Sequence, residues 1–112
     1  MISPAVRGRR AERVAALLLQ AKGLRVLERN LRIRGAGEVD VLARSGRTLV
    51  VVEVKARRRG EPAEAVDAGR QRCLRRCAEV LLADPAHSWA SGVRFDVVAV
   101  TGARFRHLRG AF

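Results

Sequence analysis

Four consecutive branched apolar residues, Leu49 to Val52, constrain the fold more than any other part of the sequence. Side chains alternate across a β-strand, so this run is apolar on both faces. A strand of that kind belongs in the middle of a sheet that is covered on both sides. The chain then continues directly into Glu53 and Lys55. Charges that enter such a strand cost free energy, which indicates that they have a task.

The remaining pattern predicts an α/β domain with the order αβββαβ, in which a mixed central sheet is flanked by helices. Asn30 is interpreted as a turn after the first strand, and Ser45-Gly46 as a hairpin turn. Helices are expected at about 5–22 and from 64 or 67 to 83, strands at about 24–29, 38–43, 49–56 and 94–100, and a last short strand at 105–108 is left open.

The chain has 112 residues, so we expect one domain over residues 1–112 with a single modest core. No run of about 18 uncharged apolar residues occurs, so no membrane-spanning helix is expected. The beginning of the chain is charged from Arg7 onward and lacks the apolar region of a signal peptide. The predicted location is therefore the cytoplasm, without a membrane partner.

The only two cysteines, Cys73 and Cys77, are four residues apart in a helical pattern. They share a helix face with Leu74, Ala78 and Leu81. Free cysteine behaves as a small buried hydrophobe, so we interpret both as reduced thiols in the core. A zinc site would need further ligands, and the two histidines offer no matching spacing.

The formal charge of +12 is the strongest signal in the composition. Such an excess favours a polyanionic partner, and nucleic acid is the simplest one. All but two of the 23 basic residues are arginine, which suits bidentate contact with phosphate. A coding bias toward arginine, without functional meaning, is the alternative explanation.

Charged side chains alternate along two neighbouring predicted strands, with Glu38 and Asp40 on one and Glu53 and Lys55 on the next. Two hairpin turns are open. A four-residue loop places Asp40 directly opposite Glu53, whereas a two-residue turn places it opposite Val51. Both registers leave the carboxylates of Asp40 and Glu53 on one side of the sheet.

Two carboxylates at this spacing form a site for a hard cation such as Mg²⁺ or Mn²⁺, which prefers oxygen ligands. The candidate ligands are the carboxylates of Asp40 and Glu53, the carbonyl of Val54, and Glu38 on the same face. Lys55 would stabilise developing charge or steer an attacking water. The alternative is the wet face of an ordinary hairpin, where paired opposite charges are common.

The ordered set of motifs resembles the PD-(D/E)xK nuclease superfamily, and more closely the YraN-like family of small bacterial proteins. The match covers nearly the whole chain. Its stretches are, in order, Asn30 with Arg32, Gly37-Glu38-Val39-Asp40-Val41-Leu42, Val51-Val52-Glu53-Val54-Lys55-Ala56-Arg57, Arg94-Phe95-Asp96-Val97-Val98 and Ala111-Phe112.

The resemblance implies a restriction-endonuclease-like core, similar to that of archaeal Holliday-junction resolvases. It also implies roles for single residues: Asp40 and Glu53 as metal-binding acids and Lys55 as the catalytic lysine. Glu12 matches the helix-borne acid of some members, although an ordinary solvated glutamate is equally compatible with its position. Gln71 matches a helical glutamine that positions substrate or water.

Arginines near the charged strands are candidates for contact with the phosphodiester backbone, and solvated loops or helix faces are the alternative. The candidates are Arg57, Arg58, Arg59, Arg70 and Arg72. Asp96, in contrast, is interpreted as a structural partner of a nearby arginine. Aromatic residues are too few for a base-stacking platform, so recognition of backbone and shape is expected.

These features predict a divalent-metal-dependent nuclease acting on DNA rather than RNA, on branched or damaged substrates. The alternative is an accessory protein that keeps the fold and binds nucleic acid without cutting it. A third interpretation is a protein-binding domain whose arginine excess is compositional. A homodimer is open, because superfamily members that cut two strands often dimerise.

Overall fold

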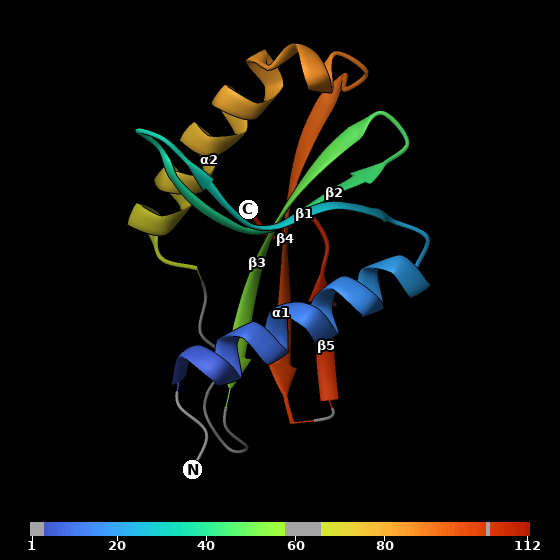
Figure 1. The fold of residues 1–112 in the computed structure, drawn as a ribbon, viewed down its shortest axis with the longest axis vertical. Helices are drawn as coiled ribbons and strands as arrows, with labels where there is room; N and C mark the ends of the chain where they lie inside the picture. The colour runs from blue at the N-terminus through green and yellow to red at the C-terminus, as the bar shows by residue number, and fades with distance from the viewer. Residues whose placement is uncertain (1–3, 58–65, 103) are drawn as a thin grey trace.

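The computed structural model describes residues 4–57, 66–102 and 104–112, with side chains from residue 9 onward. The elements follow the order α-β-β-β-α-β-β with a short 3-10 turn before β4 (Figure 1). They are α1 (Pro4–Ala21), β1 (Arg25–Ile33), β2 (Gly37–Ser45), β3 (Thr48–Arg57), α2 (Ala68–Ala83), η1 (Pro85–His87), β4 (Gly92–Thr101) and β5 (Arg104–Leu108).

The strands form one mixed sheet in the order β1-β2-β3-β4-β5, with β3 in the middle. Strand β3 is parallel to β4, and the other neighbours are antiparallel. Helices α1 and α2 lie on opposite sides of the sheet (Figure 1). The predicted αβββαβ order with a mixed central sheet is confirmed, and it is compatible with a restriction-endonuclease-like core. The last short strand is present as β5.

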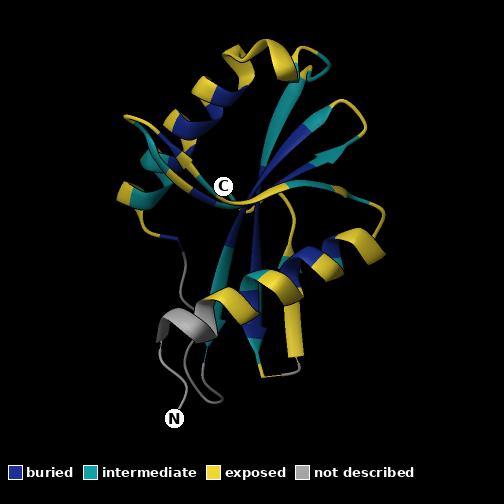
Figure 2. Ribbon diagram, viewed as in Figure 1, coloured by how far each residue is buried: buried dark blue, intermediate teal, exposed yellow. Residues whose placement is uncertain are grey.

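The core has two halves, one on each face of β3. Leu49 and Val51 pack in the half under α2, whereas Val50 and Val52 pack in the half under α1. All four are at most 1% exposed, which confirms that this run is a central strand covered on both faces. Figure 2 shows the consequence, because buried residues follow β3 and β4 while the outer sides of both helices are exposed.

Strands β2 and β3 begin as a regular hairpin and then separate. Arg44 pairs with Leu49, so the register is the one that places Asp40 opposite Glu53, but Ser45 also pairs with Thr48 and the turn itself is only Gly46 and Arg47. The pairing ends at Val41 and Val52, and β2 continues away with β1 as a twisted ribbon toward α2 (Figure 1). The next residue on each strand is an acid, so the sheet opens where the charged side chains begin.

Strand β1 differs from its prediction because it continues through Asn30 to Ile33. Asn30 does not end the strand. It adopts φ +52°, and no other non-glycine residue has a positive φ in the part of the chain that the structure describes. Asparagine tolerates this left-handed conformation better than most residues, so local propensity alone could not distinguish a turn from a kink inside a strand.

Both cysteines are free thiols at the core, as predicted. Cys77 is fully buried, and Cys73 is half-buried and packs against the same half of the core. The Cys73 thiol donates a hydrogen bond to the carbonyl of Ala36 at 3.2 Å. A Cβ atom at Gly37, whose φ is +144°, would collide with the Sγ of Cys73, so this position requires glycine.

Asp96 of β4 is buried and paired with Arg94. This pair confirms the prediction that Asp96 is a structural partner of a nearby arginine. Its side chain is 0% exposed. It accepts hydrogen bonds from Arg94 Nε at 2.8 Å and Nη2 at 3.1 Å, from the Gly110 N–H at 3.0 Å, and it contacts His107 Nε2 at 2.8 Å. Burial alone would raise the pKa of Asp96, but the bonds from Arg94, Gly110 and His107 hold it below its usual value.

No helix in the described ranges is both long and apolar enough to cross a membrane.

Asp96→Ala should lower the free energy of unfolding by about 3–5 kcal/mol, because it leaves buried donors unpaired. Glu28→Ala, at an exposed carboxylate, is the matched control and should change it by less than about 0.5 kcal/mol. The depressed pKa gives the pH dependence: the contribution of Asp96 is present above the unfolded-state pKa, near 3.8, and is lost as pH falls below it. Urea unfolding at several pH values measures both effects. A loss no larger than that of Glu28→Ala would contradict them.

Candidate functional site

The site is centred on Asp40 and Glu53, at the point where β2 leaves β3. The pairing of Val41 with Val52 places Asp40 opposite Glu53 when it is continued by one residue. The two carboxyl groups form a direct hydrogen bond. Asp40 Oδ2 also accepts a hydrogen bond from the backbone N–H of Val54 at 2.8 Å. The Asp40 side chain thus accepts the hydrogen bond that a backbone carbonyl of β2 would accept if the two strands stayed paired.

Burial and the close carboxylate make Asp40 a weak acid. Desolvation is the largest cause, and together with the hydrogen bond and negative charge of Glu53 it raises the pKa of Asp40 from 3.8 to about 8. The bond from the Val54 N–H opposes this shift. Two adjacent carboxylates cannot both ionise at low cost, so near neutral pH Asp40 holds the proton that the pair shares.

Arg70 of α2 neutralises the second carboxylate. Burial would raise the pKa of Glu53, but hydrogen bonds from Arg70 and Asp40 outweigh it and lower that pKa. The guanidinium is bidentate, with Nε at 2.7 Å from Oε2 and Nη2 at 3.1 Å from Oε1. Nη2 also donates to the carbonyl of Glu38 at 2.8 Å. This contact with Glu53 raises the pKa of Arg70, so the pair stays ionised.

Glu12 reaches the same region from α1. Burial is the main cause that raises its pKa, the charge of Glu38 adds to it, and a hydrogen bond with Asn30 opposes it. Glu12 in turn contributes to the raised pKa of Asp40, so the two carboxyl groups are electrostatic neighbours. Its Oε2 atom is buried and has no hydrogen-bond partner among the described residues. Glu12 is therefore half-buried, with one carboxylate oxygen removed from solvent.

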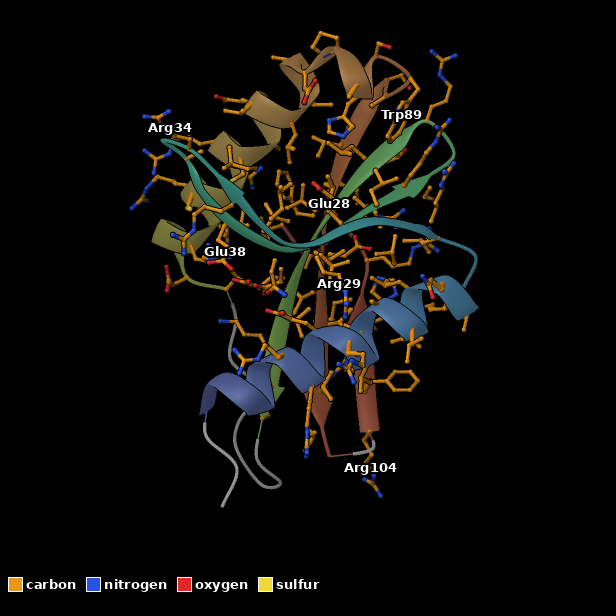
Figure 3. The ribbon with its side chains drawn as sticks, in the orientation of Figure 1. Glu28, Arg29, Arg34, Glu38, Trp89 and Arg104 are labelled. Atoms are coloured by element: carbon orange, nitrogen blue, oxygen red, sulfur yellow. The ribbon has the colours of Figure 1, made fainter. Side chains whose placement is uncertain are left out.

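Glu38 is exposed, and its backbone rather than its carboxylate contacts Arg70. Figure 3 shows Glu38 on the hairpin beside α2, and Arg29 between β1 and α1. Lys55, half-buried on β3, lies close enough to lower the pKa of Glu53 electrostatically. The structure thus brings together the two central acids, Glu12, Glu38 and Lys55.

The other predicted residues lie elsewhere or in other contacts. Gln71 donates from Nε2 to the carbonyl of Val66 at 2.9 Å, which ties the start of α2 to the segment before it. Arg72 is exposed on α2, and Arg57 is half-buried at the end of β3. Arg58 and Arg59 lie outside the described residues. A phosphate contact by Arg70 would have to replace its bonds to Glu53.

The donors at the site are all oxygens, which suits a hard cation such as Mg²⁺ or Mn²⁺. Asp40, Glu53 and the unpaired Oε2 of Glu12 are the available carboxylates. The N–H and carbonyl of one residue point to the same side of a strand, so the carbonyl of Val54 faces the opening as well. Over residues 4–57, 66–102 and 104–112, however, no three acidic, histidine or cysteine side chains are already grouped as a metal cage. The residues therefore suit a cation, but Arg70 must first release the carboxylate of Glu53.

The family model that matches this chain describes it as uncharacterised protein family UPF0102 and covers residues 11–100. The chain belongs to the UPF0102 family. This is the YraN family, so the resemblance recognised in the sequence is confirmed at that level. The matched residues include all of the site acids and Lys55.

Relatives in the family align along most of their own length. A UPF0102 protein of Parvibaculum lavamentivorans is 48% identical over 107 residues, which cover 94% of this chain and 80% of the relative. One from Beutenbergia cavernae is 49% identical over 112 residues, with 92% of each chain covered. A third, from Rhodococcus jostii, is 43% identical over 113 residues, with 94% of each chain covered.

Two contributors to the UPF0102 site were not among the predicted site residues. Asn30 was taken as a turn, and Arg29 was not singled out, yet both lower the pKa of Glu12. The signal for Asn30 was available: it precedes Arg32 in the pattern that carried the resemblance. No comparable signal marked Arg29, because it is one of many arginines.

Asp40→Asn should remove a specific pH dependence of stability. With a pKa of about 8 when folded and 3.8 as reference, Asp40 holds a proton in the folded state that the unfolded state has lost. Wild-type stability should therefore fall as pH rises from about 4 to 8 and level off above that. The asparagine side chain cannot titrate in this range. The free energy of unfolding of the variant, relative to that of the wild type, should therefore increase as pH rises from about 4 to 8.

Urea unfolding of both proteins at pH values from 5 to 9 measures the difference. Glu28→Gln, at an exposed site, is the control and should run parallel to the wild type. Parallel curves for Asp40→Asn would contradict a raised pKa at Asp40.

Proposed function

We propose that the chain is a divalent-metal-dependent nuclease that hydrolyses phosphodiester bonds in DNA, with Mg²⁺ or Mn²⁺ as cofactor and branched or damaged DNA as substrate. The observation that carries this proposal is the pair formed by half-buried Asp40 and buried Glu53 at the opening of the sheet. Two acids held together at the cost of a raised pKa are typical of functional sites. The cytoplasm is the location that we propose with this activity.

The proposed metal ligands are Asp40, Glu53 and the carbonyl of Val54, with Glu12 completing the oxygen set. A bound Mg²⁺ would supply Lewis-acid stabilisation of the phosphoryl oxygens and lower the pKa of a coordinated water. Asp40 must lose its proton to serve as a ligand, so its raised pKa makes the proton compete with the cation, and cation binding should strengthen as pH rises toward about 8.

Arg70 is the residue that must move on loading. Its bidentate contact neutralises Glu53 while no cation is bound. A cation at Glu53 would repel the guanidinium, which could then bind a phosphate of the substrate, as arginine forks commonly do. In this way the interpretation of Arg70 as a nucleic-acid contact and its observed ion pair describe two states of one residue.

Lys55 is proposed to act on the reacting phosphodiester. It lies two residues beyond Glu53 on β3, so the side chains point to the same face. Its ammonium group would hold the attacking water or stabilise the charge that develops on phosphate oxygens. Hydrolysis adds water across one P–O bond and leaves a phosphomonoester and a free hydroxyl. The surrounding arginines would hold the phosphates on either side.

A second candidate is a nucleic-acid-binding accessory protein that does not cut. The contact between Arg70 and Glu53 favours it, because a charge-neutral, fully bonded Glu53 is a stable structural element without any metal. The net charge of +12 supports binding in either case. The two candidates differ only in whether the acids are used.

Cleavage by purified protein should be tested with linear, flapped and four-way DNA in Mg²⁺ or Mn²⁺. Asp40→Asn and Lys55→Ala should each lower the rate by about 100-fold or more, as expected for loss of a metal ligand or a charge-stabilising group. Lys22→Ala is the matched control, because Lys22 is the only other lysine and is exposed at the end of α1. It should cleave like the wild type.

Wild-type cleavage no faster than that of Asp40→Asn and Lys55→Ala would reject the nuclease. Binding that weakens steeply with salt, without cleavage in any metal, would select the accessory protein. No binding to DNA or RNA at low salt would reject both candidates.

A further inference from the structure

Asn30 combines an unusual backbone conformation with a position beside the site acids. It adopts φ +52° inside β1, away from any turn. The pairs Arg29 with Val41 and Leu31 with Val39 lie on either side of it, so Asn30 is opposite Asp40. Asp40 is in turn opposite Glu53. A left-handed residue therefore stands in the same row across the sheet as the two site acids.

The side chain of Asn30 is bonded to Glu12, the acid supplied by α1. The kinked part of β1 is thus bonded to α1 beside the site acids. Figure 3 shows the neighbouring Arg29 between β1 and α1. Residues in sparsely populated backbone regions cost free energy, and they persist mainly at sites where the surrounding structure uses the conformation.

The carboxylate of Glu12 is only half satisfied. Its Oε2 atom is buried without a hydrogen-bond partner among the described residues, whereas the group as a whole bonds Asn30. A buried acceptor without a partner costs free energy. Loss of the Asn30 bond would free the side chain to rotate this atom into water. The bond therefore holds Glu12 in an orientation that is unfavourable by itself but leaves one oxygen available.

We propose that Asn30 is a positioning residue, whose left-handed conformation turns its side-chain amide onto Glu12 and thereby presents the free carboxylate oxygen of Glu12 as a ligand for a divalent cation shared with Asp40 and Glu53. This inference rests on the proposed function. Asn30 itself touches neither cation nor substrate. Asn30 acts through Glu12, so the effects of substitutions at the two positions on cation binding should not be additive.

The test is Mn²⁺ binding to the purified full chain, measured by calorimetry without nucleic acid. Asn30→Gly keeps the left-handed backbone but removes the amide, and should weaken Mn²⁺ binding by about 10–100-fold, the usual effect of losing a residue that orients a ligand. Glu12→Gln should weaken it at least as much. The double variant should bind like Glu12→Gln alone, because the amide has no other route to the cation.

Stability separates positioning from a purely structural role. Glycine adopts φ +52° freely, so Asn30→Gly should unfold at nearly the same urea concentration as the wild type. Asn30→Ala should lose more stability through strain but bind Mn²⁺ like Asn30→Gly. If Mn²⁺ affinity instead followed stability across the two variants, the positioning role would be rejected.

The remaining outcomes distinguish this inference from the proposed function. Wild-type protein that binds no Mn²⁺, or Asp40→Asn that binds it equally well, would overturn both. Binding that is lost in Asp40→Asn but retained in Asn30→Gly would overturn the role of Asn30 and leave the metal site standing. Weakening in Asn30→Gly without weakening in Glu12→Gln would show that Asn30 does not act through Glu12, which also overturns the inference.

Discussion

The bond from the Val54 N–H to the carboxylate of Asp40 is the interaction on which the site depends. A backbone donor in the central strand loses its neighbour where β2 turns away, and an unpaired buried donor is costly. Asp40 satisfies it from the departing strand. The sheet can therefore open without leaving the Val54 N–H unsatisfied, and the same carboxylate lies against Glu53. The same hydrogen bond therefore accompanies both the separation of β2 from β3 and the clustering of the acids.

Two compensations make this cluster stable without a metal. Asp40 retains a proton, and Arg70 places its guanidinium against Glu53. Each reduces the negative charge that would otherwise repel across the pair. Both compensations are reversible, because the proton exchanges with solvent and Arg70 lies on a helix face beside the opening. This reversibility is a requirement of the cation site that we propose.

Asp96 and Glu53 show how the fold treats buried acids in two ways. Both are paired with an arginine, but Asp96 is also bonded to a backbone N–H and His107 and has no carboxylate neighbour. It locks β4 to β5 and to the C-terminal segment. Glu53 instead faces a second acid whose pKa is raised. The companion of each acid, rather than its burial, separates the structural carboxylate from the candidate functional one.

The sequence by itself determined the order of elements, the central place of β3, and the common side of Asp40 and Glu53, because alternation along strands is a local property. It could not determine that β2 leaves β3 at Val41, that Asn30 kinks within a strand, or that Arg70 pairs with Glu53. These outcomes depend on contacts between segments far apart in the chain. The requirement for Gly37 likewise follows from the thiol of Cys73, which only packing of α2 brings to it. Strand patterns are set residue by residue, whereas the partners of a buried charge are chosen by the whole fold.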